Sequence, residues 1–296
     1  MSIKNVTLIG ASGNLGRAVL PVLLKSDFNI TIISRQDSSA TFPDGTKVVR
    51  SDYSPESLTQ ALMGQDAVVS MITITALAEQ QKVANAAIAA GVKLFLPSEF
   101  GSDTASDAVI AAVPFFKPKK DFIDFLAANE AKMSWAAIVT GPFFDWGLTY
   151  GLTGFDVANK TATLVDGGKA RFSATNVVQI ARSIIAVLEH PDIVANRFIY
   201  VESFSTNQLE VLAALEKATG EKWQVKYESS DDLRTVGFQK FQEGDLVTGG
   251  TNIIKAAILG EGSLEDHSHV AGGIWNERLG LPKEDVDEVV KKVLSS

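Results

Sequence analysis

The sequence predicts an α/β protein built on a doubly wound parallel sheet, and three features carry this prediction. Residues 6–9 form a short apolar run that leads through a glycine-rich turn into a helical pattern at residues 17–25. Apolar runs and helical patterns then alternate as far as residue 139, as parallel strands with crossover helices require. The apolar run 67–72 is typical of a strand covered on both faces. Together these features indicate a Rossmann-type sheet.

Each expected element carries a local signal. Ser54 is placed to cap a helix that Gly64 follows, and Gly91 and Gly220 close two further helices. The expected strands are 6–9, 29–33, 47–49, 67–72, 92–96, 134–139 and 197–201. The expected helices are 17–25, 55–63, 79–90, 119–129, 176–189 and 207–219. In the remaining chain we expect an aromatic-rich loop at 141–147, a hairpin arm at 162–165, and short helices and polar loops after residue 220.

Composition restricts the function classes. The 296 residues contain no cysteine, which excludes disulfides, thiol catalysis and thiolate metal sites. The formal charge of −8 argues against a general polyanion-binding surface, so no direct nucleic-acid partner is expected. No stretch of eighteen apolar residues and no signal-peptide pattern is present, so we expect a cytoplasmic protein without a membrane partner.

The glycine-rich turn predicts a dinucleotide site. Gly10 permits the tight turn after the strand, Gly13 lets the backbone approach a pyrophosphate, and Gly16 lets the helix pack closely on the sheet. The phosphates would lie at the helix N-terminus, where free N–H groups and the helix dipole favour an anion. The alternative is a glycine-rich loop without a ligand. The residues expected to contact the cofactor here are Gly10, Ala11, Ser12, Gly13, Asn14, Leu15 and Gly16.

The second expected strand ends in Ser34 and Arg35, where an NAD-preferring site carries an acidic residue for the ribose hydroxyl. Arg35 can present its planar guanidinium to a 2′-phosphate, which favours NADP(H) as the cofactor. The alternative is a solvated surface arginine paired with Asp37. Other strand ends, at Thr73 and Ser98, reach the same edge of the sheet and are expected to line the site.

This reading divides the chain into two parts. Residues 1–150 are expected to form the NADP-binding Rossmann domain, with a strand and a helix returning to it around 174–202. Residues 151–296 are expected to form mainly a smaller, interleaved substrate-binding lobe.

The sequence signal for a proton donor is weaker than that for the cofactor site. None of the four tyrosines has a lysine four residues later, so the Tyr-x-x-x-Lys pair of ordinary short-chain dehydrogenases is missing. Lys119 lies three residues before Phe122, on the inward stripe of the helix 119–129, whereas Lys120 is turned about 100° away. Partial burial, the helix dipole and repulsion among three lysines should lower the pKa of the amine, which suits acid–base catalysis. A solvated basic patch is the alternative.

Other candidates are weaker. His267 and His269 are too few and too isolated for a metal site, and no metal is expected. Glu99 fits a structural carboxylate that accepts backbone N–H groups better than a catalytic one. The aromatic residues of 141–147 could line a pocket for a planar substrate or simply pack in the core.

These segments together resemble the NmrA-like / isoflavone reductase-like family of atypical short-chain dehydrogenase/reductases, with the fungal branch most similar. The sequences PSEFG at 97–101 and GPFFDWG at 141–147 carry the resemblance more specifically than the glycine turn does. The family implies an NADPH-dependent reductase of aromatic or related secondary metabolites, with a lysine as general acid–base. That lysine corresponds best to Lys119, with Lys120 as the fallback, and Thr73 and Phe143 are implied to lie near the nicotinamide.

Two functions follow from this reading. The first is a reductase in which Lys119 exchanges a proton with the substrate oxygen while hydride moves to carbon. The second, implied by the NmrA side of the family, is a non-catalytic redox sensor that binds NADP(H) and acts on a protein partner. The sequence specifies neither the substrate and its stereochemistry nor the oligomeric state.

Overall fold

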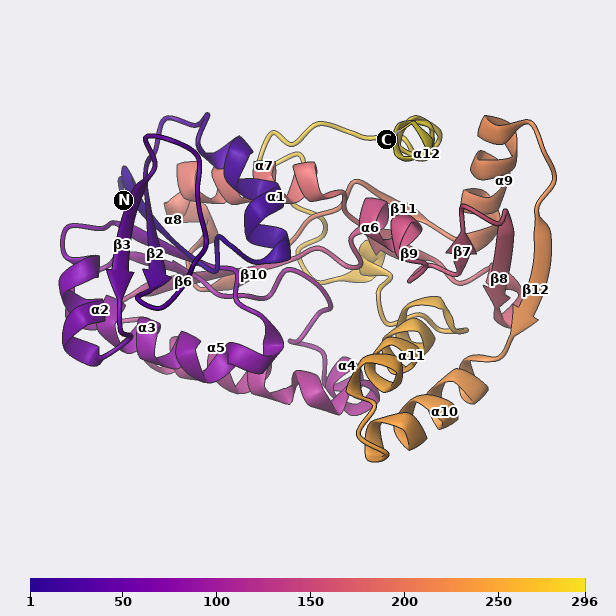
Figure 1. The fold of residues 1–296 in the computed structure, drawn as a ribbon, viewed down its shortest axis with the longest axis horizontal. Coiled ribbons are helices and arrows are strands. Elements are labelled where there is room, and N and C mark those ends of the chain that lie inside the picture. Colours follow the sequence, from indigo (N-terminus) through magenta and orange to yellow (C-terminus); the bar gives the residue numbers. More distant parts are fainter. Residues whose placement is uncertain (296) are drawn as a thin grey trace.

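Apolar segments of the first 200 residues form a seven-stranded parallel sheet in the computed structural model, which describes residues 1–295 (Figure 1). Neighbouring strands pair in parallel, with Val6 opposite Ile30 on one side and Ala67 on the other. In spatial order the strands are β10 (Arg197–Tyr200), β6 (Ser134–Val139), β5 (Leu94–Leu96), β4 (Ala67–Ser70), β1 (Asn5–Ile9), β2 (Asn29–Arg35) and β3 (Lys47–Ser51). The predicted doubly wound parallel sheet is therefore confirmed.

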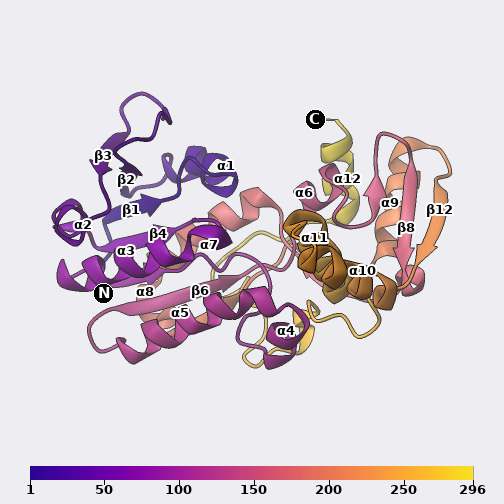
Figure 2. The same ribbon diagram turned by 60° about the horizontal axis from the view of Figure 1, so that its bottom comes forward.

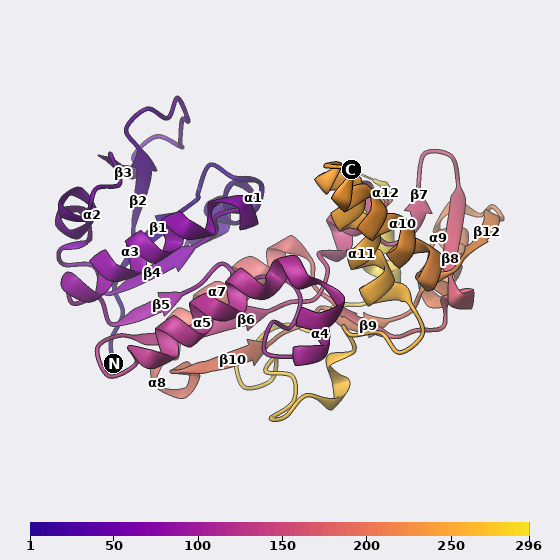
Figure 3. The same cartoon turned by 90° about the horizontal axis from the view of Figure 1, so that it is seen from below.

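Helices cover both faces of this sheet. On one face lie α1 (Asn14–Leu23) and α7 (Val177–Glu189), whose apolar residues join one core cluster with β1 and β6. The other face carries α2 (Pro55–Leu62), α3 (Leu77–Ala89) and α5 (Lys117–Ala128), which share a second cluster. Figure 3 shows α3 and α5 running along that face. The short helices α4 (Asp107–Ala112) and α8 (Pro191–Val194) precede α5 and β10.

Local capping is as the sequence predicts. The Ser54 hydroxyl accepts a hydrogen bond from the Ser57 N–H at the start of α2, and Gly64 follows with a φ of 74°. Pro118 occupies the first turn of α5, where its missing N–H costs nothing. Within residues 1–295, no helix has both the length and the apolar character of a membrane span.

The rest of the chain forms a smaller lobe around a separate core. Its elements are α6 (Phe144–Thr149), β7 (Phe155–Asp156), β8 (Thr161–Val165), α9 (Gln208–Thr219), β12 (Gln224–Glu228), α10 (Ser230–Gln242), α11 (Leu246–Leu259) and α12 (Val286–Leu294). Strands β7, β8 and β12 form a sheet, and the antiparallel pair β9 (Phe172–Ala174) and β11 (Phe204–Thr206) links it to the larger sheet. Figure 2 shows α10 and α11 side by side between α4 and β8.

Two expectations for this lobe are wrong and one is confirmed. The aromatic segment 141–147 is not wholly a loop, because α6 begins at Phe144. The hairpin arm expected at 162–165 is present, since β8 pairs antiparallel with β7 before it, and a 3₁₀ turn follows at Asp166. The chain after residue 220 contains a strand and two long helices rather than short helices and loops. Glycines within α11 and the polar sequence of α10 hide these helices from pattern analysis.

Candidate active site

Two adjacent cavities open at the edge of the seven-stranded sheet where its parallel strands end. The first has a volume of about 350 Å³ and the second about 640 Å³. Gly13, Met71, Ile72 and Thr73 line both. An elongated ligand can therefore run from one cavity into the other along the ends of β1 and β4.

The glycine turn forms the boundary between the cavities, and its geometry requires glycine. Gly10 has a φ of 80°, and a Cβ there would lie 2.6 Å from the Met71 carbonyl oxygen. A Cβ on Gly16 would lie 2.3 Å from the Gly10 oxygen, so this glycine lets α1 approach the turn. Helix α1 starts at Asn14, directly after the turn, so its free N–H groups lie at the cavities. The predicted residues of this turn that line one cavity or the other are Gly10, Ala11, Ser12, Gly13, Asn14 and Leu15.

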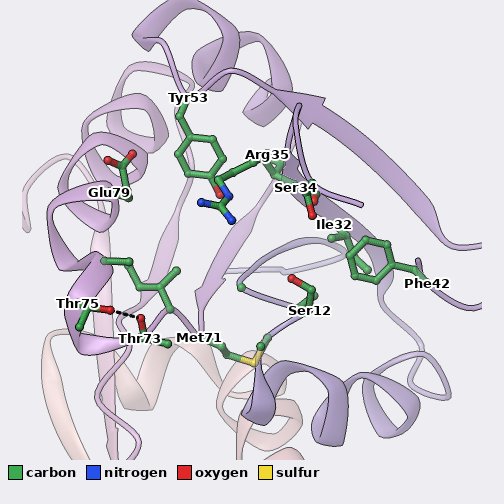
Figure 4. A pocket seen from close by; sticks show the side chains of 17 residues that line it. Ser12, Ile32, Ser34, Arg35, Phe42, Tyr53, Met71, Thr73, Thr75 and Glu79 are labelled. Atoms are coloured by element: carbon green, nitrogen blue, oxygen red, sulfur yellow. Dashed lines mark hydrogen bonds between the residues drawn. The ribbon is translucent and has the colours of Figure 1, made fainter. Parts of the chain in front are cut away.

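The first cavity extends to the end of β2, where Ser34 and Arg35 lie on its wall. Figure 4 shows the Arg35 guanidinium beside the Tyr53 ring. The Arg35 side chain is 73% exposed and lies 4.0 Å from Asp37, which is a weak surface pairing. Both roles considered for Arg35 therefore remain compatible with its position: the guanidinium reaches the cavity and also Asp37.

Two residues of this region escaped the sequence analysis. Arg50 donates hydrogen bonds to the Ser34 hydroxyl (3.0 Å) and to the Ser38 carbonyl oxygen (2.8 Å), and so holds the loop after β2 against the cavity. Tyr53 lines the cavity with a φ of 62°, a strained conformation for a residue with a side chain. The sequence gives no signal for the Arg50 hydrogen bonds or for the position of Tyr53, because both depend on how β2 and β3 pair.

The second cavity is mainly apolar. The Phe143 and Trp146 rings meet edge to face with centroids 5.5 Å apart, so Phe143 packs and lines the cavity at once. Thr73 lies at the junction with the first cavity, where its hydroxyl is 2.9 Å from that of Thr75. The larger apolar side chains of the lining include Phe100, Phe115, Phe116, Phe143, Trp146, Tyr150, Leu152, Ile254 and Ile258. Ile254 and Ile258 come from α11, which no sequence pattern connects to the site.

Ser98 lies on the wall of the second cavity, but its polar groups are used within the protein. Its hydroxyl donates to the Ile72 carbonyl oxygen at 2.7 Å, and its N–H donates to the Gln80 Oε1 at 2.8 Å. Ser98 therefore ties the end of β5 to β4 at the cavity wall.

Lys119 reaches the same cavity from α5. Its Nζ donates a hydrogen bond to the Glu99 carbonyl oxygen at 2.7 Å and lies 5.7 Å from the centre of the Phe116 ring. Burial lowers the pKa of Lys119, while the Glu99 and Glu265 carboxylates oppose that effect.

Lys120 is placed differently. Its Nζ lies 3.2 Å from Asp124, and the residue is not part of the cavity wall. Lys117 likewise pairs with Asp121. The expected repulsion among the three lysines is thus offset by carboxylates one turn along the helix, and burial is the main cause of the Lys119 shift.

Glu99 is buried beside Lys119 and accepts a hydrogen bond from the Thr104 hydroxyl at 2.6 Å. The expected backbone N–H donors are not its partners among residues 1–295, where Oε1 has no hydrogen-bond partner. Burial raises the pKa of Glu99, against the influence of Lys119 and Thr104.

Comparison with known proteins identifies the family. A model of the NmrA-like family matches residues 2–249. The chain belongs to the NmrA-like family. Oxidoreductase poxI of Penicillium oxalicum is 36% identical over 304 residues, which cover 96% of this chain and 92% of that protein. Oxidoreductase aprR of Aspergillus flavus is 33% identical, with 99% of each chain covered.

Among solved structures, this NmrA-like protein resembles AtPrR2, whose structure was determined with NADP+ and (+)pinoresinol. The TM-score is 0.81 at 20% sequence identity, and 99% of each chain is covered. At this identity the likeness concerns the fold, and it confirms the Rossmann-type arrangement with a smaller lobe. The resemblance deduced from the sequence motifs is confirmed by the family match.

Proposed function

We propose that this NmrA-like protein is an NADPH-dependent reductase that transfers hydride to a small aromatic or secondary-metabolite-like substrate. The observation that carries the proposal is the position of Lys119, a half-buried amine on the wall of an apolar cavity that continues from the glycine turn. The names of the relatives, oxidoreductases poxI and aprR, support a redox reaction. The complex of AtPrR2 with pinoresinol supports a small aromatic substrate.

The residues present fit NADP(H). At Gly10 and Gly16 a Cβ would collide with backbone, and the N-terminus of α1 offers free N–H groups for the diphosphate. Ser34 and Arg35 would hold the adenosine end, with Arg35 on the 2′-phosphate. Thr73, Ser98 and the Phe143 ring would border the nicotinamide end if it extended toward the second cavity. When bound, the cofactor supplies the hydride.

The chain's own contribution is to hold the substrate and supply a proton. The aromatic walls of the second cavity suit a flat apolar molecule and exclude water from it. The Glu99 carbonyl oxygen orients the Lys119 ammonium, which would donate a proton to the substrate oxygen. Burial lowers the pKa of Lys119, so the ammonium gives up its proton more readily than a solvated lysine.

We further propose that the chain is divided, as expected from the sequence, into a cofactor-binding part and a substrate-binding part. Residues 1–150 would bind the cofactor, together with α7 and β10 of the 174–202 segment, which complete the large sheet. Residues 151–296 would mainly form the substrate lobe. The contribution of Ile254 and Ile258 to the second cavity supports this division, because a molecule bound in that cavity would lie between the two parts.

The test is a pair of variants, Lys119→Met and Lys120→Met, assayed by NADPH oxidation with (+)-pinoresinol and other oxygenated aromatic compounds. Because general acid catalysis contributes about 10²–10⁴-fold, Lys119→Met should lower kcat by about that factor. NADPH affinity, measured by calorimetry, should stay nearly unchanged. Lys120→Met should behave like the wild type, since Lys120 pairs with Asp124 outside the cavity.

Unchanged kcat in Lys119→Met would remove this lysine from the mechanism. If no compound in the panel oxidises NADPH although NADPH binds tightly and alters affinity for a protein partner, the sensor function replaces the reductase.

A further inference from the structure

Arg50 joins the end of β2 to the loop that follows it. It lies on the edge strand β3, directly opposite Ser34 of β2. Its Nη1 donates hydrogen bonds to the Ser34 hydroxyl at 3.0 Å, to the Arg35 carbonyl oxygen at 3.3 Å and to the Ser38 carbonyl oxygen at 2.8 Å. Its Nη2 donates to the Ala40 carbonyl oxygen at 3.0 Å. One guanidinium therefore fixes the position of both segments.

These contacts support the wall of the first cavity from behind. Ser34, Arg35 and Ser38 line that cavity, and Figure 4 shows Ser34 and Arg35 next to each other on its wall. Arg50 is not among the residues that line it. Arg50 can therefore influence a ligand in the cavity mainly through the groups that it holds.

The Ser34 hydroxyl is the held group that can bind a ligand directly. A hydroxyl has one proton to donate and two lone pairs that accept. Because Arg50 donates to the Ser34 oxygen, the Ser34 proton must point away from Arg50. Ser34 is only 7% exposed, and its hydroxyl makes no other hydrogen bond in the described part of the chain. Its proton is therefore left for an acceptor in the cavity, and the guanidinium polarises it for that role.

The charges at this end of the cavity favour an anionic acceptor. The four groups that accept from Arg50 are uncharged, so none of them neutralises its guanidinium. Arg35, the next residue after Ser34, lies 4.0 Å from its carboxylate partner Asp37. Glu79, an acidic residue of the cavity lining, lies 2.9 Å from Lys82. Two guanidinium groups thus accompany the Ser34 hydroxyl, as a phosphate requires.

We infer that Arg50 is a positioning residue that acts through the Ser34 hydroxyl and directs its proton to the 2′-phosphate of NADP(H). The inference rests on the placement of the cofactor under the proposed function and deepens it. Arg35 would contact the phosphate as a charged group, and Ser34 would add a neutral donor that Arg50 orients from outside the cavity.

The experiment is a double-mutant cycle with Ser34→Ala and Arg50→Met, read by calorimetric titration with NADP+ and with NAD+, which lacks the 2′-phosphate. The quantity compared is the preference for NADP+, the ratio of the two dissociation constants. Ser34→Ala should lower it by about 10- to 100-fold, the loss expected for one hydrogen bond to a charged group. Arg50→Met should lower it by about 2- to 10-fold, because the released hydroxyl can rotate away.

The double variant separates positioning from a general structural effect. If Arg50 acts through Ser34, the double variant should have the same NADP+ preference as Ser34→Ala alone. A merely structural loosening of the loop would weaken both nucleotides alike and leave the ratio unchanged. The inference is overturned if Arg50→Met leaves the ratio unchanged, or if its effect on the ratio persists in full in the Ser34→Ala background.

Two further variants complete the test. Arg50→Lys keeps the charge, but its single nitrogen cannot reach all four acceptors. It should lower the NADP+ preference by less than Arg50→Met, and it replaces that variant if Arg50→Met does not fold. Lys47→Met removes an equal charge from an exposed position on the same strand and should leave the preference unchanged.

The outcome is separable from that of the proposed reductase. A lowered NADP+ preference in the Arg50 variants of a protein that reduces no substrate would support the role of Arg50 and count against the reductase. An unchanged preference in the Arg50 variants of an active reductase would do the reverse.

Discussion

Arg35 shows how one residue could decide which dinucleotide is bound. Its guanidinium is mostly exposed, and its pairing with Asp37 at 4.0 Å is too weak to hold it away from a ligand. A 2′-phosphate in the first cavity would instead receive charge-assisted hydrogen bonds, each contributing about 1.5–3 kcal/mol.

Replacement of Arg35 by alanine should therefore weaken NADPH binding by about 10- to 100-fold, as expected for the loss of roughly 1.5–3 kcal/mol. NADH binding should change little, because NADH lacks the phosphate. Calorimetric titration with both nucleotides measures the difference. Arg234→Ala, which removes an equal charge from the distant helix α10, is the control. Equal losses for NADPH and NADH would show that Arg35 does not contact the phosphate.

At this scale the sequence predicts what depends on local backbone and misses what depends on packing. The roles of Gly10 and Gly16 could be predicted directly, since a strand–turn–helix unit of this kind requires glycine at these positions in any such sheet. Arg50 and Tyr53 could not, because their contacts arise only when β3 lies beside β2.

At the scale of elements, the paired helices α10 and α11 are the part of the smaller lobe least visible in the sequence, although α11 lines the second cavity. They pack so closely that a Cβ on Gly249 would lie 2.6 Å from the Phe241 backbone nitrogen. At the neighbouring Gly250 the nearest atom is the Phe115 Cζ at 3.7 Å, an ordinary contact. A pair of glycines normally indicates that a segment is not helical. Gly249 and Gly250 allow the close contact between α10 and α11, but they also prevent a prediction of α11 from the sequence.

This difference predicts opposite effects for two adjacent substitutions. Gly249→Ala should push the helices apart and lower the free energy of unfolding by about 1–3 kcal/mol. Gly250→Ala should be neutral or raise it by up to about 1 kcal/mol, because alanine favours the helix and meets no backbone. Urea denaturation of both variants measures the effect. Similar stability of the two variants would mean that the α10–α11 contact is looser than the structure indicates.

At the scale of the whole molecule, the central sheet was predictable and the smaller lobe largely was not. Strands buried on both faces and short crossovers give a strong sequence signal, and every strand predicted for the large sheet is present. The lobe instead combines short strands from 155–156, 161–165 and 224–228 with helices far apart in the chain. Its core forms only when these distant segments meet. The sequence therefore gives no signal that residues such as Ile254 and Ile258 line the second cavity.

We propose that one NADP(H) molecule spans both cavities, with its diphosphate at the start of α1 and its nicotinamide toward Lys119. A crystal structure of the protein grown with NADP+ tests this most directly. We expect density for the diphosphate at the N–H groups of residues 13–15 and for the nicotinamide in the second cavity, on the side that Lys119 lines. A nucleotide bound elsewhere, or a nicotinamide directed away from Lys119, would contradict the account.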